Sequence, residues 1–328
     1  MGNLVFSGIQ PSGAIHIGNY AGAIRNWIRL QEEMECIFCI VDYHAMTMPY
    51  EPKEMQTRIL EAVIDVMACG IDPERSRLFV QSHVPEHTEL AWILSCVAPM
   101  GELNRMTQFK EKSERLESVN VGLFTYPVLQ AADILLYKAD TVPVGEDQVQ
   151  HLEVTRVIAR RFNTTFGELF PEPQAMLTRA PRIMSLNDPT RKMSKSIEGS
   201  AIMLSDSEES IRRIIRRAVT DTGPSEQGVM SPGVANLFTL LEVFASEETI
   251  KSFRDDYEEG KLRYKDLKQS LTDSMLEVLR PIRERRQALS ARPQEVREIV
   301  VETGRQMRRR AADTLQEVRE KAGLGALP

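Results

Sequence analysis

The first 162 residues alternate short apolar runs with segments of helical length, and this alternation limits the fold more than any other feature. Apolar runs typical of buried strands lie at 4–6, 36–41, 77–82 and 142–144. Segments with the apolar spacing of a helix lie at 20–28, 53–69, 86–97, 128–137 and 148–162. Such alternation indicates βαβ units, which form a parallel sheet covered by helices on both faces. We therefore predict a Rossmann-like, doubly wound parallel sheet.

The pattern changes after about residue 200, where strand-like runs disappear and helices dominate. Helical spacing covers 236–245, 261–279 and 293–321. Ser205 and Glu208 have the spacing of a capping box that opens an Arg-rich helix. Proline residues predict a loop at 171–181, before this change. We predict two domains, an α/β catalytic domain at 1–198 and an α-helical domain at 199–328.

The composition is that of an ordinary globular protein. The chain has 328 residues, of which 27% are charged, and a formal net charge of −6. No apolar run approaches the roughly 20 residues that a membrane span needs. The N-terminal residues MGNLVFSG lack the basic segment of a signal peptide. A cytoplasmic protein without a membrane partner is expected.

The cysteines do not predict a metal site. Cys36 and Cys39 have CxxC spacing but lie in an apolar strand, and Cys69 and Cys96 are isolated on helical patterns. Free cysteine packs as a small hydrophobic residue, so four buried thiols are expected. Pro85 separates the histidines at 83 and 87 and interrupts the helix that would align them. No structural metal is predicted.

Two polar segments could bind phosphate. The first strand is followed by GIQPSGAIHIGNY at 8–20, a small-residue loop that enters a helix, and exposed N–H groups at such a junction suit an anion. KMSKS at 192–196 carries two lysines and two hydroxyl groups in a loop that could close over phosphates. Each segment alone could be an ordinary polar connection.

Together the two segments resemble the signature motifs of class I aminoacyl-tRNA synthetases. GIQPSG, TQFKEK at 107–112, TYPVLQAADILLY at 125–137, VPVGEDQVQH at 142–151 and KMSKS follow in order and closely resemble the bacterial tryptophanyl-tRNA synthetases. The resemblance covers at least 4–196 and continues more loosely through AVTD at 218–221. It implies activation of L-tryptophan with ATP and Mg²⁺ to Trp-AMP, transfer to tRNA(Trp), and a homodimer.

Asp133 is the candidate residue for amino-acid recognition. It lies in an otherwise apolar helical segment, AADILLY, where an unpaired carboxylate would be costly; an exposed turn of the helix is the alternative. The resemblance makes it the acceptor for the indole N–H, and a buried acceptor rejects side chains that lack the donor. The same resemblance implies a tryptophan pocket walled or contacted by Phe6, Gly8, Gln10, His44, Tyr126, Gln130, Val142, Val144 and Gln148. For His44 a purely structural role is the alternative.

The resemblance also implies an ATP site. Its residues are Gln10, Pro11, Ser12, Gly18, Asn19, Gly145, Glu146, Asp147, Ile183, Lys192, Met193, Ser194, Lys195 and Ser196. Lys112, Lys192 and Lys195 are the catalytic candidates, because preorganised cations stabilise the charge on departing pyrophosphate. Gln130 stands where many relatives carry Met, and His16 stands where some carry Thr. After KMSKS, Ile197-Glu198-Gly199 replaces the common Asp-Pro continuation.

Two alternative functions stay open at this point. One is a tyrosyl-specific or other nucleotidyltransferase with the same two motifs, although residues 131–133 offer a single acceptor and no second polar partner for a phenol. The other is a non-catalytic, synthetase-like RNA-binding paralogue. The Arg-rich runs at 211–217 and 305–310 are candidates for contact with the tRNA anticodon arm, or are solvated charged faces.

Overall fold

The protein contains a parallel sheet, as predicted. The computed structural model describes residues 4–114, 118–145, 148–177, 181–195, 197–220 and 230–325, apart from the side chains of Glu111 and Lys112. Within these ranges the sheet has the strand order β3-β2-β1-β4-β5, with all neighbours parallel. The strands are β1 (Leu4–Ile9), β2 (Glu35–Ile40), β3 (Arg77–Val80), β4 (Thr141–Val144) and β5 (Gln174–Leu177).

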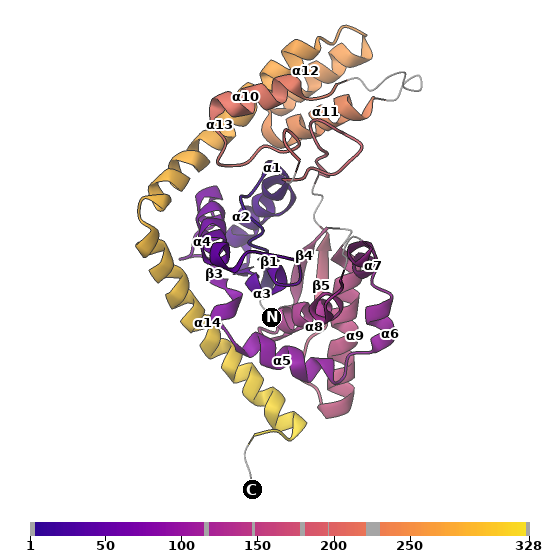
Figure 1. The fold of residues 1–328 in the computed structure, drawn as a ribbon, viewed down its shortest axis with the longest axis vertical. Helices are drawn as coiled ribbons and strands as arrows, with labels where there is room; N and C mark the ends of the chain where they lie inside the picture. Colours follow the sequence, from indigo (N-terminus) through magenta and orange to yellow (C-terminus); the bar gives the residue numbers. More distant parts are fainter. Residues whose placement is uncertain are drawn as a thin grey trace.

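Alternate side chains of each central strand enter two different apolar layers. In β2, Phe38 and Ile40 belong to one buried cluster, whereas Ile37 and Cys39 belong to the other. The first cluster includes residues of α2 (Arg25–Glu33) and α4 (Pro52–Cys69), and the second includes residues of α5 (Glu86–Ser95), α8 (Val121–Leu135) and α9 (Val149–Phe166). Helices therefore cover both faces of the sheet (Figure 1).

Shorter elements connect these layers. They are α1 (Ile17–Asn19), the π-helix η1 (Tyr20–Ile24), α3 (Asp42–Ala45), the 3₁₀-helix η2 (Gln81–His83), α6 (Met100–Asn104) and α7 (Thr107–Ser113). Several of them follow the carboxyl end of a strand, where the loops of a doubly wound sheet carry ligand contacts.

The second half of the chain is helical in the described residues beyond 197. Its helices are α10 (Glu208–Arg217), α11 (Pro232–Phe244), α12 (Glu247–Glu258), α13 (Tyr264–Ser290) and α14 (Pro293–Ala322). Figure 1 shows α10, α11 and α12 gathered at one end, while α13 and α14 run along one side of the molecule. No helix among the described residues is both long and apolar enough to cross a membrane.

The last helix returns to the α/β part. Met307 and Leu315 of α14 join the same buried cluster as Phe79 of β3 and Leu90 of α5. Helix α14 also passes close to η2, because a Cβ on Gly304 would lie 3.0 Å from the Cβ of His83. Helix α14 therefore packs on the α/β part, although it lies in the second predicted domain. The predicted domain boundary between residues 198 and 199 stays a prediction.

Several predicted local features are wrong. The predicted loop at 171–181 contains β5, an edge strand whose pattern is too exposed to give an apolar run. Helix α8 begins at Val121 rather than at 128, because Asn120 accepts a hydrogen bond from the Leu123 N–H and caps it. The N-cap of α10 is Ser207, not Ser205, and Cys96 is exposed, whereas the other three cysteines are buried.

Candidate active site

Polar segments meet at the carboxyl edge of the sheet. β1 lies between β2 and β4, and the strand order reverses there: β2 and β3 lie on one side of β1, and β4 and β5 lie on the other. The segments that follow β1, β2 and β4 are therefore neighbours, and the Val41 N–H donates to the Ile9 carbonyl at 3.0 Å. In doubly wound sheets this point of reversal is where ligands bind.

Asp133 lies at the centre of a buried hydrogen-bond network. Its side chain comes from α8, and the residue is only 1% exposed. Gln81 Nε2 and His87 Nδ1 each lie 2.7 Å from Asp133 Oδ1, and His44 Nε2 lies 2.7 Å from Oδ2. The alternative of an exposed helical turn is therefore wrong.

The charge of Asp133 is stabilised by these donors. Burial alone would raise the pKa of Asp133, but His44 and His87 outweigh it and hold the pKa below its usual value. An ionised carboxylate only accepts hydrogen bonds and offers about four acceptor positions, of which three are taken by these contacts. One position on Oδ2 can serve a ligand N–H.

Three members of this network were not predicted as site residues. Gln81 follows β3 directly, at the same carboxyl edge of the sheet where His44 follows β2 within α3, and this placement was the signal that could have identified it. His87 lies in the first turn of α5, and its Nε2 is 2.8 Å from the hydroxyl of Tyr137. His87 thus bridges Asp133 and Tyr137. In the sequence, this histidine had been considered only as a possible metal ligand.

The predicted apolar wall residues lie close to this network. The Phe6 ring stacks on Tyr137 with centroids 5.9 Å apart, and Val142 and Val144 are buried in β4. The Tyr126 hydroxyl lies 2.5 Å from His151 Nε2, and burial raises the pKa of Tyr126 to about 12. A Cβ on Gly8 would lie 2.8 Å from Val41 Cγ1, so the close approach of β1 and the end of β2 requires glycine there.

The other predicted tryptophan contacts are at least partly exposed. Gln10 is exposed at the end of β1, Gln130 is half-buried in α8, and Gln148 is half-buried directly before α9. Their roles toward a ligand stay predictions.

His16 caps the helix α1, which follows it directly in the chain. His16 Nδ1 accepts hydrogen bonds from the N–H groups of Gly18 and Asn19 at 3.0 and 3.3 Å, and Asn19 Oδ1 accepts from the His16 N–H. A Cβ on Gly18 would lie 2.8 Å from the His16 ring, so this cap fits only over glycine. Threonine is also a preferred cap, so it could take the place of His16 in this role.

His16 is electrically coupled to the KMSKS segment. Burial, followed by the charges of Lys195 and Lys192, lowers the pKa of His16 to about 4. The ring is therefore neutral at pH 7, as the acceptor role of Nδ1 requires.

Lys195 joins the two signature segments directly. Its Nζ donates to the Gly13 carbonyl at 3.1 Å and to the Ser12 hydroxyl at 3.4 Å. Burial lowers the pKa of Lys195. Met193 is buried, and its sulfur lies beneath Gly18, where a Cβ would be 3.7 Å away. The meeting of these segments, predicted from the sequence, is confirmed.

The KMSKS segment rests on a short hairpin. Met184 pairs with Lys192 in an antiparallel bridge, and the Met193 N–H donates to the Ile183 carbonyl at 3.3 Å. Asn236 of α11, 4% exposed, binds both the N–H and the carbonyl of Met184 at 2.8 and 3.0 Å. A buried amide in the helical part therefore holds the loop that carries the lysines.

The atypical continuation after KMSKS forms a turn. The Ser200 N–H donates to the Ile197 carbonyl at 3.1 Å, and Gly199 has a φ of +74° that favours glycine. Ser200 Oγ accepts from the Ser194 N–H at 3.2 Å.

The remaining predicted ATP contacts divide into two sets. Pro11 and Ile183 are buried, Asn19 and Gly145 are half-buried, and Lys192 is exposed. Glu146, Asp147, Ser196 and the side chain of Lys112 lie outside the described residues.

Comparison with known proteins agrees with this geometry. The family model described as "tRNA synthetases class I (W and Y)" matches residues 3–280. The chain belongs to this family. It is 47% identical over 331 residues to a tryptophan–tRNA ligase of Caldanaerobacter subterraneus subsp. tengcongensis, with 98% of each chain covered. It is 44% identical over 330 residues to the corresponding ligase of Helicobacter pylori, again with 98% of each chain covered.

Solved structures of class I synthetases have the same fold. Tryptophanyl-tRNA synthetase from Campylobacter jejuni, complexed with ADP and tryptophan, is 35% identical with a TM-score of 0.84, over 98% of this chain and 100% of that one. The Mycoplasma pneumoniae enzyme is 34% identical with a TM-score of 0.87, over 99% of both chains. A tyrosyl-tRNA synthetase from Archaeoglobus fulgidus, at 21% identity and a TM-score of 0.70, shares the fold alone; 87% of this chain and 90% of that one are covered.

Proposed function

We propose that this protein is a tryptophan–tRNA ligase, which activates L-tryptophan with ATP to Trp-AMP and transfers the tryptophanyl group to tRNA(Trp). The observation that carries this proposal is Asp133, an ionised buried carboxylate with three protein donors and one acceptor position left. An indole N–H would fill that position. A side chain without this donor would leave the position unpaired, and such a loss discriminates strongly.

Activation requires the amino-acid carboxylate to attack the α-phosphorus of ATP. A C–O–P bond forms and the bond from the α-phosphorus to the bridging oxygen breaks, so pyrophosphate carries the leaving charge. Lys195 stands on the small-residue loop that follows β1, and Lys192 lies near enough to His16 to lower its pKa. We assign both lysines, with Lys112, to stabilising that charge as it develops.

Mg²⁺ fits this site as a companion of ATP. Among the described residues no group of three or more His, Cys, Asp or Glu side chains is arranged to hold a metal ion. Mg²⁺ commonly keeps several waters and binds through substrate phosphates, so it would enter with the triphosphate.

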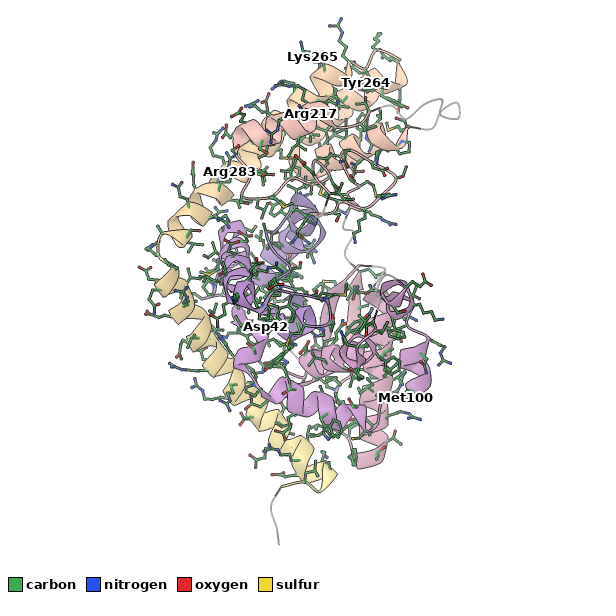
Figure 2. All side chains as sticks on the ribbon, viewed as in Figure 1. Asp42, Met100, Arg217, Tyr264, Lys265 and Arg283 are labelled. Carbon is green, nitrogen blue, oxygen red and sulfur yellow. The ribbon has the colours of Figure 1, made fainter. Side chains whose placement is uncertain are left out.

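Helix α10 is our candidate surface for tRNA. Arg216 and Arg217 are exposed, and neither forms an ion pair among the described residues, while Figure 2 shows Arg217 in the helical part, far from Asp42. The Arg-rich run of α14 differs, since Arg308 pairs with Glu86 and Arg310 pairs with Glu35. Arg216 and Arg217 of α10 are thus available for phosphates, whereas Arg308 and Arg310 of α14 are used to dock the helix.

A binding measurement tests this assignment. Replacing Arg216 and Arg217 with alanine should weaken tRNA binding about tenfold and reduce the slope of log affinity against log salt concentration by about two. The control is Arg309→Ala in α14, an exposed arginine outside α10. Equal effects of the α10 and α14 variants would contradict the assignment to α10.

We also propose a homodimer, supported by exposed apolar side chains on neighbouring helices. Trp92 of α5 is 73% exposed, Met100 of α6 is 63% exposed, and Val121 of α8 is 75% exposed. Trp92→Glu should shift the sedimentation of the protein to that of a monomer. An unchanged dimer would exclude this surface.

Amino-acid-dependent ATP–pyrophosphate exchange tests the proposed reaction. Tryptophan should support exchange and tyrosine should not, and charging of tRNA(Trp) should follow. Exchange with tyrosine alone, or with neither amino acid, would overturn the proposal.

A further inference from the structure

We propose that Asp65 and Arg286 are positioning residues for the loop at 11–19, and that they set the affinity of the site for ATP. This inference rests on the proposed function, because it assigns the pair a role in the same reaction. Asp65 lies in α4 and Arg286 lies in α13, so neither belongs to a signature motif.

The Asp65 carboxylate holds two parts of the chain at once. The residue is 2% exposed. Its Oδ2 accepts from the Ile15 N–H at 3.2 Å, and its Oδ1 accepts from Arg286 Nε at 2.6 Å. One side chain therefore connects the first loop to the helical part of the chain.

The other groups of this loop are fixed from the opposite side. The Ile15 carbonyl accepts from the Leu204 N–H at 2.9 Å, and the Ile17 N–H donates to the Ile202 carbonyl at 2.9 Å. Segment 202–204 thus runs along one side of the loop, while Asp65 holds the Ile15 N–H. Residue 15 directly precedes His16, so a shift there would move the cap of α1 and the N–H groups beside it.

Arg286 is needed to keep this carboxylate in place. Burial raises the pKa of Asp65, and the Arg286 charge and the Ile15 N–H oppose that rise. Arg286 Nη2 also lies 4.0 Å from Glu61, so its removal would leave two acids near each other. The carboxyl group would then take up a proton or turn away, and either change would loosen its hold on Ile15.

The neighbouring Arg285 provides a matched control. Its Nε donates to the Ala68 carbonyl of α4 at 2.6 Å, so it joins the same two helices. Within the described part of the chain, the Arg285 side chain forms no hydrogen bond to the loop at 11–19. If Asp65 and Arg286 only held α13 against α4, replacing Arg286 would have the same effect as replacing Arg285. If they position the loop, replacing Arg286 would change the KM for ATP and replacing Arg285 would not.

The experiment measures the KM values for ATP and tryptophan in pyrophosphate exchange for four variants. Asp65→Ala should raise the KM for ATP about tenfold, because it leaves a buried N–H unpaired, and should leave the KM for tryptophan within about twofold. Asp65→Asn keeps an acceptor for the Ile15 N–H, so its KM for ATP should stay within about threefold of the wild-type value. Arg286→Met should lie between these variants, and Arg285→Met should leave both KM values unchanged.

Each outcome decides between positioning and structural support. Equal effects of Arg285→Met and Arg286→Met, or parallel changes in both KM values, would overturn the inference. If Asp65→Ala does not fold, the KM values for ATP of Asp65→Asn and Arg286→Met still decide between the two roles. A wild-type protein without tryptophan-dependent exchange would refute the proposed function instead, whereas an active wild type with unchanged variants would refute this inference alone.

Discussion

The amino-acid end and the phosphate end of the candidate site are built in opposite ways. At the amino-acid end, Asp133 is buried and receives hydrogen bonds from three side chains of the α/β part. At the phosphate end, two loops meet through Lys195, whose contact with Ser12 joins positions 183 residues apart. The first arrangement suits discrimination, since its geometry is fixed before a ligand arrives. The second suits a reaction in which charge moves, since loops can close and withdraw.

The largest effect is expected from removing the centre of the fixed end. Asp133→Ala should lower kcat/KM for tryptophan by on the order of 10³-fold, because the indole N–H and three buried donors lose their acceptor. Pyrophosphate exchange measures this loss, and exchange with an analogue that has sulfur in place of the indole nitrogen measures discrimination. Near-normal activation of tryptophan by the variant would refute the role of Asp133.

A smaller effect of a different kind is expected at the adjustable end. Lys195→Ala should reduce kcat by about 10²- to 10³-fold while changing the KM for ATP only a few-fold, as expected for a contact that strengthens in the transition state. Lys195→Arg, which keeps the charge, is the matched control. A raised KM for ATP with kcat unchanged would indicate simple binding and remove the proposed contrast between the two ends.

The pH dependence of stability tests the link between the two loops. The pKa of His16 is about 4 in the folded protein against an ordinary value of 6.5, so the unfolded chain takes up this proton first. The contribution of neutral His16 is therefore complete above pH 6.5 and is lost as the pH falls toward 4. His16→Thr keeps a cap without this titration.

Urea unfolding at pH 7 and pH 5 compares the two proteins. The wild type should lose more free energy of unfolding over this interval than His16→Thr does. Equal losses would show that His16 does not titrate with the lowered pKa, and would weaken the evidence that Lys192 and Lys195 lie close to it.

The smallest effect is expected from Ser12. Its hydroxyl lies 3.4 Å from Lys195 Nζ, whereas the Gly13 carbonyl lies at 3.1 Å and is unaffected by the change. Ser12→Ala should therefore cost less than about 1 kcal/mol of transition-state stabilisation, measured as kcat/KM for ATP. A much larger loss would mean that the hydroxyl contacts ATP directly.

The sequence alone determined the main features of this protein. Apolar alternation predicted the parallel sheet, because strands buried on both faces must be apolar. The position of Asp133 in an apolar helix predicted a buried, partnered carboxylate, since an unpaired one would be too costly there. The resemblance of the motifs to those of class I synthetases implied that residues 8–20 and 192–196 would meet, and Lys195 joins them.

Only the tertiary structure decided which groups hold these features in place. Gln81 and His87 bind Asp133 from elements 52 and 46 residues away, and no local pattern marks such partners. The edge strand β5 lacks the burial that makes a strand visible in a sequence. The Arg-rich segments of α10 and α14 have similar sequences. In the folded protein, arginines of α14 pair with acidic residues of the α/β part, whereas Arg216 and Arg217 of α10 stay exposed. Hydrogen bonds and ion pairs depend on which surfaces meet, and that is fixed by the packing of the whole chain.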